Sequence, residues 1–232
     1  MRKENKTQAI VLSKINYAEY DRIVTILSKD FGKLKVMVRG IRRQNSKLAS
    51  SLDFFSVSNV TIYIGKSEIN RLISANLSVF YDNILTDIDR VDTAFQFMKI
   101  MNKTTETDDS SEYFDILNVS LAGLNDMSID RILVINWFYC QFLNTYGHMP
   151  NLTTSQNGKK LNKDENYIFS LDDFTFHSSN LDTALFTDDI KYLRLLFSLK
   201  ELQILNNIKG TKEINIKLFP IIEAMFRSFN LV

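Results

Sequence analysis

The chain of 232 residues has 45% hydrophobic residues, 28 Lys and Arg, and 27 Asp and Glu, which excludes wholesale disorder and allows a sizeable core. Its longest stretch without a charged residue, 132–158, is densely apolar only over 132–143. That is shorter than the ~20 apolar residues of a membrane span. No apolar segment with a cleavage site follows Met1, and Cys140 is the only cysteine, so no internal disulfide can form. We expect a cytoplasmic protein without a secretory signal.

The near-neutral total hides an uneven distribution of charge. Residues 1–76 carry a net charge of +8, whereas residues 77–232 carry −7. A basic first third joined to an acidic remainder indicates two domains with different partners, the first one polyanionic. Ordinary sampling of surface charge is the alternative explanation.

The first third of the chain has the pattern of a small β-sheet. Short runs rich in Val, Ile, Thr and aromatic residues are separated by turn signals, as strands are. The predicted strands are residues 9–15, 22–28, 33–40, 54–64 and 69–75. No crossover helix fits between them, so the sheet is predicted to be antiparallel. The favoured closed form is a five-stranded barrel of the OB type, with an SH3-like barrel as the main competitor.

Beyond residue 78 the hydrophobic period becomes helical. The predicted helices are residues 88–103, 112–124, 128–146, 188–206 and 212–229. Gly123 and Gly147 are candidate C-terminal glycines, and Ser128 is a candidate N-cap. The helix at 128–146 is apolar nearly all round and should be the centre of its domain. The predicted layout is therefore β + α in two domains, an OB-fold domain at 1–78 and a helical domain at 79–232. Residues 147–182 form an irregular insertion with strand-like pieces.

The third predicted strand and the loop after it carry an unusual concentration of positive charge. Residues 33–47 hold six cations and no acid. Strand alternation places Lys33, Lys35 and Arg39 on one face, and the loop adds the rest of the set, Arg42, Arg43 and Lys47. Such a cluster is suited to the phosphate backbone of nucleic acid. A merely solvated strand face is the alternative.

Aromatic residues in the same domain could stack on unpaired bases, although core packing is the favoured explanation for each ring. They are Tyr17, Tyr20, Phe31, Phe55 and Tyr63. No phosphate-binding glycine loop, paired-carboxylate constellation or serine elbow is present, so the sequence predicts no enzyme. Cys140, inside an apolar helix, is read as a small buried hydrophobe.

Several segments together resemble the RecO family of bacterial DNA repair and recombination mediators. They are residues 7–12, 17–28, 31–34, 38–43 and 46–48, continued by Phe54 and the turn at 63–65. The segment 137–150, which ends in Tyr146, Gly147, His148, Met149 and Pro150, resembles the corner after a helix of that family. The resemblance covers most of the chain and is strongest over residues 7–65.

The resemblance implies a function and a set of partners. Family members bind single- and double-stranded DNA, anneal complementary strands and bind the acidic C-terminal tail of single-stranded-DNA-binding protein (SSB). With RecR they help to load RecA onto SSB-coated strands. Arg39, Arg42, Arg43 and Lys47 match the family's basic segment, so they are the first candidates for DNA contact, with Lys33 and Lys35 beside them. Arg22 could do the same, or pair with Glu19 or Asp21. A nucleoid-associated location in the cytoplasm follows.

One departure from the family concerns zinc. Many relatives carry four zinc-binding cysteines after the corner, whereas residues 150–160 contain none. Structural zinc needs four N or S ligands, and this region offers only His148 and His177. We therefore predict no zinc and no other cofactor, and expect 147–182 to be a degenerate, cysteine-free form of the zinc-finger insertion.

The site for the SSB tail is harder to place from sequence. Such a tail needs an apolar trough flanked by cations. Arg131 is our candidate, with Arg90, Lys191 and Arg194 on other helices, and an ion pair of Arg131 with Asp130 is the alternative role. The rival function is an interaction scaffold whose barrel binds RNA or protein and anneals nothing.

Overall fold

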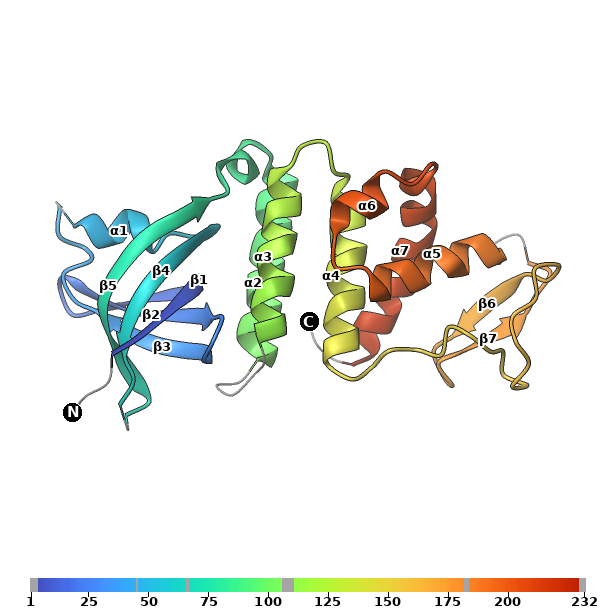
Figure 1. Ribbon diagram of the computed structural model, residues 1–232, viewed down its shortest axis with the longest axis horizontal. Coiled ribbons are helices and arrows are strands. Elements are labelled where there is room, and N and C mark those ends of the chain that lie inside the picture. The colour runs from blue at the N-terminus through green and yellow to red at the C-terminus, as the bar shows by residue number, and fades with distance from the viewer. Residues whose placement is uncertain (1–3, 45, 66, 106–110, 182–183, 230–232) are drawn as a thin grey trace. The chain divides into compact units, whose positions relative to one another are not determined.

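A computed structural model describes residues 4–44, 46–65, 67–105, 111–181 and 184–229 (Figure 1). It shows the predicted β + α layout, in two compact units, Met1–Met127 and Ser128–Val232. The division lies later than the predicted boundary at residue 78, because the helical segments after the sheet pack on the strands. Within the described residues, no helix is both long enough and apolar enough to cross a membrane.

Five strands of the first unit form a closed barrel with the order β1-β2-β3-β5-β4 (Figure 1). They are β1 (Glu4–Tyr17), β2 (Asp21–Ser28), β3 (Gly32–Val38), β4 (Ser56–Tyr63) and β5 (Ile69–Phe80). Strand β1 closes the barrel because its first half pairs with β4 and its second half with β2. This double pairing makes β1 longer than the sequence predicted.

One pairing departs from the predicted antiparallel sheet. Strands β3 and β5 run parallel, with Lys35 opposite Ile69 and Met37 opposite Arg71. The other four pairings are antiparallel. A ring of five strands cannot alternate direction throughout, so one neighbouring pair has to be parallel. The chain reaches β5 from β3 by way of strand β4, which lies between them in the sequence.

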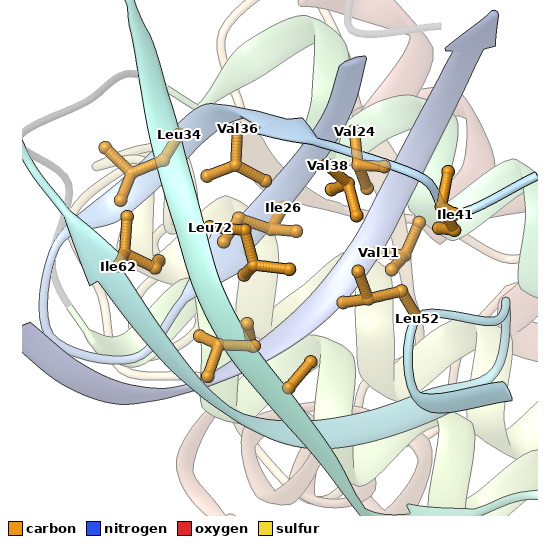
Figure 2. Close-up of a cluster of buried hydrophobic side chains, with 13 residues drawn as sticks. Val11, Val24, Ile26, Leu34, Val36, Val38, Ile41, Leu52, Ile62 and Leu72 are labelled. Carbon is orange, nitrogen blue, oxygen red and sulfur yellow. The ribbon is translucent and has the colours of Figure 1, made fainter. Parts of the chain in front are cut away.

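The barrel interior is filled by branched aliphatic side chains (Figure 2). On β3, Leu34, Val36 and Val38 are buried, while Lys33, Lys35 and Met37 between them are more accessible. The predicted alternation of this strand is therefore confirmed. Ile41 and Leu52, from the loop between β3 and β4, complete the same cluster.

The segment between β3 and β4, which the sequence predicted as a loop, contains regular structure. It contains a short helix, α1 (Lys47–Ser51), which contacts β5. Leu48 and Leu52 pack against the barrel core. These leucines are four residues apart, about one helical turn, so they lie on the same side of the helix.

Helical segments cover part of the outer barrel surface. They are η1 (Asp82–Thr86), α2 (Ile88–Thr104) and α3 (Ser111–Asn125). Ile10 and Leu27 point away from the barrel interior yet are fully buried, because α2 and α3 contact these strands. Arg90 on α2 donates to the carbonyl oxygens of Leu124, at 2.7 Å, and Asp126. These bonds provide partners for backbone carbonyl groups at the end of α3. The helix continues past Gly123, the predicted terminal glycine.

The second unit is built around the predicted central helix. Its helices are α4 (Arg131–Thr145), α5 (Thr187–Ser198), α6 (Leu202–Asn206) and α7 (Thr211–Ser228). Helix α4 is buried over residues 133–143. Its N-cap is Asp130, whose carboxylate accepts from Ile132 N at 2.8 Å, and not Ser128 as predicted. Gly147 follows the C-cap with φ +84°, as expected for a C-terminal glycine.

A single helix was predicted over 188–206, but two helices are present, separated by residues 199–201. Trp137 Nε1 on α4 donates to Leu199 O at 2.8 Å, and Gln141 Nε2 donates to Leu196 O at 2.6 Å. These carbonyl groups therefore bond to side chains of α4. The break follows from tertiary hydrogen bonds that local sequence periodicity does not reveal.

The insertion in the second unit contains a hairpin of β6 (Tyr167–Ser170) and β7 (Thr175–Ser178). Phe176 is fully buried and its ring lies 5.3 Å from that of Phe169. At the corner after α4, His148 stacks on Phe229 with ring centroids 3.9 Å apart, and Phe174 meets Phe229 at 5.2 Å. Aromatic packing thus connects the hairpin to α7.

Two isoleucines of the barrel should differ sharply in how much their replacement lowers the free energy of unfolding. Replacing Ile26, which is fully buried, by Ala should lower the free energy of unfolding by about 2–5 kcal/mol because it leaves a cavity. Ile15→Ala, at a side chain that is 61% exposed, is the matched control and should change it by about 0.5 kcal/mol or less. Urea unfolding measures both, and equal effects would contradict the assigned barrel interior.

Candidate nucleic-acid interface

The barrel presents the basic side chains of β3 on its outer surface. Because Leu34, Val36 and Val38 fill the interior, Lys33 and Lys35 must point outward. Arg39, which follows Met37 in this alternation, lies just after the strand and is exposed. The barrel core therefore determines which side of the strand carries the charge.

Two of these lysines already have partners within the first unit. Lys33 Nζ donates to Asn102 O at 2.9 Å, near the C-terminal end of α2, where cations interact favourably with the helix. Lys35 forms an ion pair with Glu68 in the turn before β5, and its hydrogen bond lowers the pKa of the Glu68 carboxyl. Lys33 and Lys35 therefore contribute less unbalanced positive charge than the sequence indicated.

The arginines after β3 lie against the turn between β1 and β2. Gly40 N donates to Asp21 Oδ1 at 2.8 Å, and Arg42 N donates to Tyr20 O at 3.0 Å. The Arg43 guanidinium lies 5.6 Å from the centre of the Tyr20 ring, within reach of a cation–π interaction. The two hydrogen bonds thus fix the backbone of the loop, and the third contact places the Arg43 side chain at the Tyr20 ring.

We use the name arginine corner for Arg39, Arg42 and Arg43 together with Tyr17 and Tyr20. All five residues are exposed, with Tyr17 at 53% and Tyr20 at 43% of full accessibility. The corner can therefore offer guanidinium groups to phosphates and aromatic faces to bases. Sequence reasoning grouped the arginines but missed that Tyr20 and Asp21 hold them in place. The close spacing of an aromatic and an acid in the β1–β2 turn was the only signal.

Gly40 allows this arrangement because its φ is +67°, a conformation that side chains with a Cβ rarely adopt. A Cβ built at this position would meet Cδ and Nε of Arg43 at 3.5 Å, an ordinary contact. The requirement for glycine is therefore conformational more than steric. It ties the orientation of the corner to a single backbone position.

Among the other residues predicted in this domain, one cation forms a hydrogen bond across strands and two aromatic residues pack in the core. Arg22 Nε donates to Oδ1 of Asn16, its cross-strand neighbour, at 3.0 Å. Asp21, a predicted candidate partner of Arg22, accepts a hydrogen bond from Gly40 N. Phe55 is buried and Phe31 packs against the core, so core packing explains both. Lys47 begins α1, but its side chain lies outside the described residues.

The candidate cations for a tail-binding site are distributed over both units. Arg131 is the first residue of α4 and is partly buried. Arg90 belongs to the first unit and is buried at the end of α3. In the second unit, Arg194 Nε donates to Leu152 O at 2.7 Å and Lys191 pairs with Asp188 at 2.7 Å. Arg90 and Arg194 thus have structural partners that sequence could not show.

A metal site would need several His, Cys, Asp or Glu side chains close together in the part of the chain that the structure describes. Within it, no three His, Cys, Asp or Glu residues gather closely enough to hold a metal ion. Cys140 is fully buried, and burial raises the pKa of its thiol well above the usual value, which fits the interpretation as a buried hydrophobe. His177 Nε2 lies 2.8 Å from Asp173 Oδ2, within the hairpin.

Comparison with known proteins gives one family. Residues 1–80 match the family model described as Recombination protein O N terminal. The chain is 29% identical over 148 residues to the DNA repair protein RecO of Thermoanaerobacter sp. (strain X514), covering 63% of this chain and 59% of that protein. It is 30% identical over 146 residues to that of Acetivibrio thermocellus, covering 62% and 58%.

A third protein of the same name, from Chloroherpeton thalassium, is 29% identical over 148 residues, which cover 63% of this chain and 57% of that protein. The chain thus spans just under three fifths of the length of these curated relatives. These matches agree with the resemblance found in the sequence: the chain is similar to RecO proteins over about 148 residues, and residues 1–80 match the model of their N-terminal domain.

Proposed function

We propose that the protein is a DNA repair and recombination mediator that binds single- and double-stranded DNA and anneals complementary strands without being an enzyme. Relatives named DNA repair protein RecO support the repair role. The observation that carries the proposal is the arginine corner, in which a loop with three exposed arginines is hydrogen-bonded to the β1–β2 turn, where two exposed tyrosines lie. The proposed barrel type is OB, supported by the position of β4 between β1 and β5.

The corner explains how DNA could be held without sequence preference. Arginine contacts to phosphates supply affinity and release counterions, but they carry no information about the bases. Stacking on Tyr17 or Tyr20 would add affinity for unpaired bases of any identity. The corner would therefore bind mixed sequences, as an annealing protein must.

Annealing follows from the same charges. Two strands repel each other through their phosphates, and cations placed between them reduce that repulsion. The arginines, extended by Lys33, Lys35 and Lys47 on the same segment, would hold two backbones close enough for bases to pair. In this proposal the protein contributes charge and position, and base pairing itself selects the complement.

The second unit would connect this activity to protein partners. We propose that it binds the SSB C-terminal tail, with Arg131 contacting the acidic groups of the tail. RecR would be its second partner, and through both partners the protein would help to load RecA onto SSB-coated strands. We also propose that the β6–β7 insertion is the cysteine-free counterpart of the zinc-bearing insertion of other family members. Aromatic packing between Phe174, Phe229 and His148 supports this, because it holds the hairpin in place together with the backbone hydrogen bonds between Tyr167 and Leu185. The cytoplasmic nucleoid is the corresponding location.

Removing two arginines of the corner tests the DNA-binding proposal. Arg42→Ala with Arg43→Ala should weaken binding to all mixed-sequence strands. The slope of log K against log salt should become shallower by about 1.4, at ~0.7 for each lost phosphate contact on single strands. Fluorescence anisotropy of a labelled strand at several salt concentrations measures both quantities.

The matched control removes the same charge elsewhere. Lys209→Ala with Lys212→Ala changes two exposed cations of the second unit and should leave the slope nearly unchanged. An unchanged slope in the arginine variant would contradict the assignment of the corner. If the unaltered protein bound no DNA at low salt, the rival function, a barrel that binds RNA or protein as a scaffold, would replace the proposal.

Gly40 provides a test of the corner's geometry. Gly40→Ala should cost about 1–2 kcal/mol of unfolding free energy, because alanine is strained at positive φ. It should also weaken DNA binding, since Arg42 and Arg43 are directed by this turn. Gly40→Asn should lose less of both, because asparagine tolerates this conformation better. Urea unfolding and anisotropy measure the two effects, and equal behaviour of Ala and Asn would contradict the role of backbone strain.

A further inference from the structure

A second polar surface lies on the barrel, across strands β1, β4 and β5. Ala9, Val60 and Leu72 on these strands point into the core, so the residues that alternate with them point outward. The register places the outward residues directly opposite one another in three rows. We use the name polar ladder for these rows, Gln8–Asn59–Asn76, Lys6–Thr61–Ser74 and Glu4–Tyr63–Arg71.

The chemistry of the polar ladder changes from row to row. The first row consists of three amides, the second of a lysine beside two hydroxyl groups, and the third places Tyr63 between Glu4 and Arg71. Asn59, Asn76, Lys6 and Arg71 are exposed, and Tyr63 is partly buried. The surface therefore offers many neutral donors and acceptors, with one aromatic ring at its end.

The ladder is hollowed along its length. A pocket of about 660 Å³ lies over the first two rows, and one of about 280 Å³ lies over the third row and Ile73. The turn between β2 and β3 forms a wall of the larger pocket through Lys29 and Asp30. That wall is fixed because Lys29 N donates to Gln8 O at 2.9 Å and Thr7 Oγ1 donates to Asp30 Oδ2 at 2.7 Å.

The charge of this surface is nearly balanced, unlike that of the arginine corner. Lys6 and Lys29 line the larger pocket with Asp30, and Arg71 lines the smaller one with Glu4. Lys29 Nζ also lies 3.4 Å from Asp115 Oδ1. A surface of this kind gains little from binding phosphates alone. Amide and hydroxyl groups instead match the hydrogen-bonding edges of bases, as asparagine and glutamine do with adenine.

A protein partner fits the polar ladder less well. Protein interfaces have a core of apolar and aromatic side chains. Here the two pockets expose Ile73 and Tyr63 among otherwise polar or charged residues, and Val60 is buried. Unpaired nucleotides fit better, because Tyr63 can stack on a base, Lys6 and Arg71 can reach its phosphates and the amides can bond its edge.

We propose that the polar ladder binds the unpaired bases of a single strand, as a second nucleic-acid site on the same barrel. This inference rests on the proposed function and adds that two surfaces of the barrel bind different parts of the DNA. The arginine corner binds backbone and depends strongly on salt, whereas the polar ladder binds bases and depends on salt weakly. Paired bases have their Watson–Crick edges occupied, so the ladder contributes to the binding of single strands and not of duplexes.

Two neutral substitutions in the first row test this inference. Asn59→Ala with Asn76→Ala removes two exposed amides that lie opposite each other and changes no charge. Affinity for a mixed-sequence single strand should fall about tenfold. The salt slope and the affinity for duplex of the same length should not change. The control, Asn157→Ala with Asn207→Ala, removes two exposed amides of the second unit and should have no effect on either.

The variants are compared only where circular dichroism and the melting temperature match those of the unaltered protein. Tyr63→Leu is a second, independent variant, which keeps an apolar side chain and removes the stacking surface. A selective loss of single-strand affinity in both variants supports the inference. Unchanged affinity, or equal losses for single strand and duplex, overturns it.

The outcomes also separate this inference from the proposed function. If the arginine variant loses salt-dependent binding while the amide variant binds as before, the inference about the polar ladder is contradicted and the proposed mediator function stands. If the unaltered protein binds neither single strand nor duplex, both are wrong. Binding of a protein to the ladder with no effect of the variants on DNA would also overturn the inference.

Discussion

Closure of the barrel around its aliphatic core is the constraint on which the other features of the first unit depend. Once Val24, Ile26 and Val36 are buried together, each strand has one possible orientation, because a shift by one residue would turn its apolar side chains to solvent. This fixes the cations of β3 on the outside and the loop after it beside the β1–β2 turn. It equally fixes the polar residues of β1, β4 and β5 in aligned rows.

The same barrel therefore carries two outer surfaces of different chemistry. At the arginine corner, hydrogen bonds from the backbone of Gly40 and Arg42 direct side chains that carry full charge. On the polar ladder, cross-strand register aligns neutral groups such as Asn59 and Asn76. A protein that pairs strands needs both affinity for backbones and access to bases. Placing these on separate surfaces of one rigid barrel would let them act together.

Sequence patterns predicted those features that local periodicity determines. The alternation of β3, the central position of α4 and the C-terminal Gly147 all follow from residues close together in the chain. Features set by distant partners could not be predicted. Lys33 bonds to a carbonyl of α2, Arg90 bonds to the end of α3, and Leu199 breaks a helix because Trp137 binds it. The parallel pairing of β3 and β5 is likewise a property of the closed ring and of no single strand.

The central claim is that the barrel brings complementary strands together through its outer surface. The most direct measurement is the rate at which two complementary mixed-sequence strands, labelled for energy transfer, pair when the protein is added at low and at high salt. The account predicts pairing much faster than without protein, with the acceleration lost at high salt and reduced by Arg42→Ala with Arg43→Ala. Tight, salt-sensitive binding with no acceleration of pairing would contradict it.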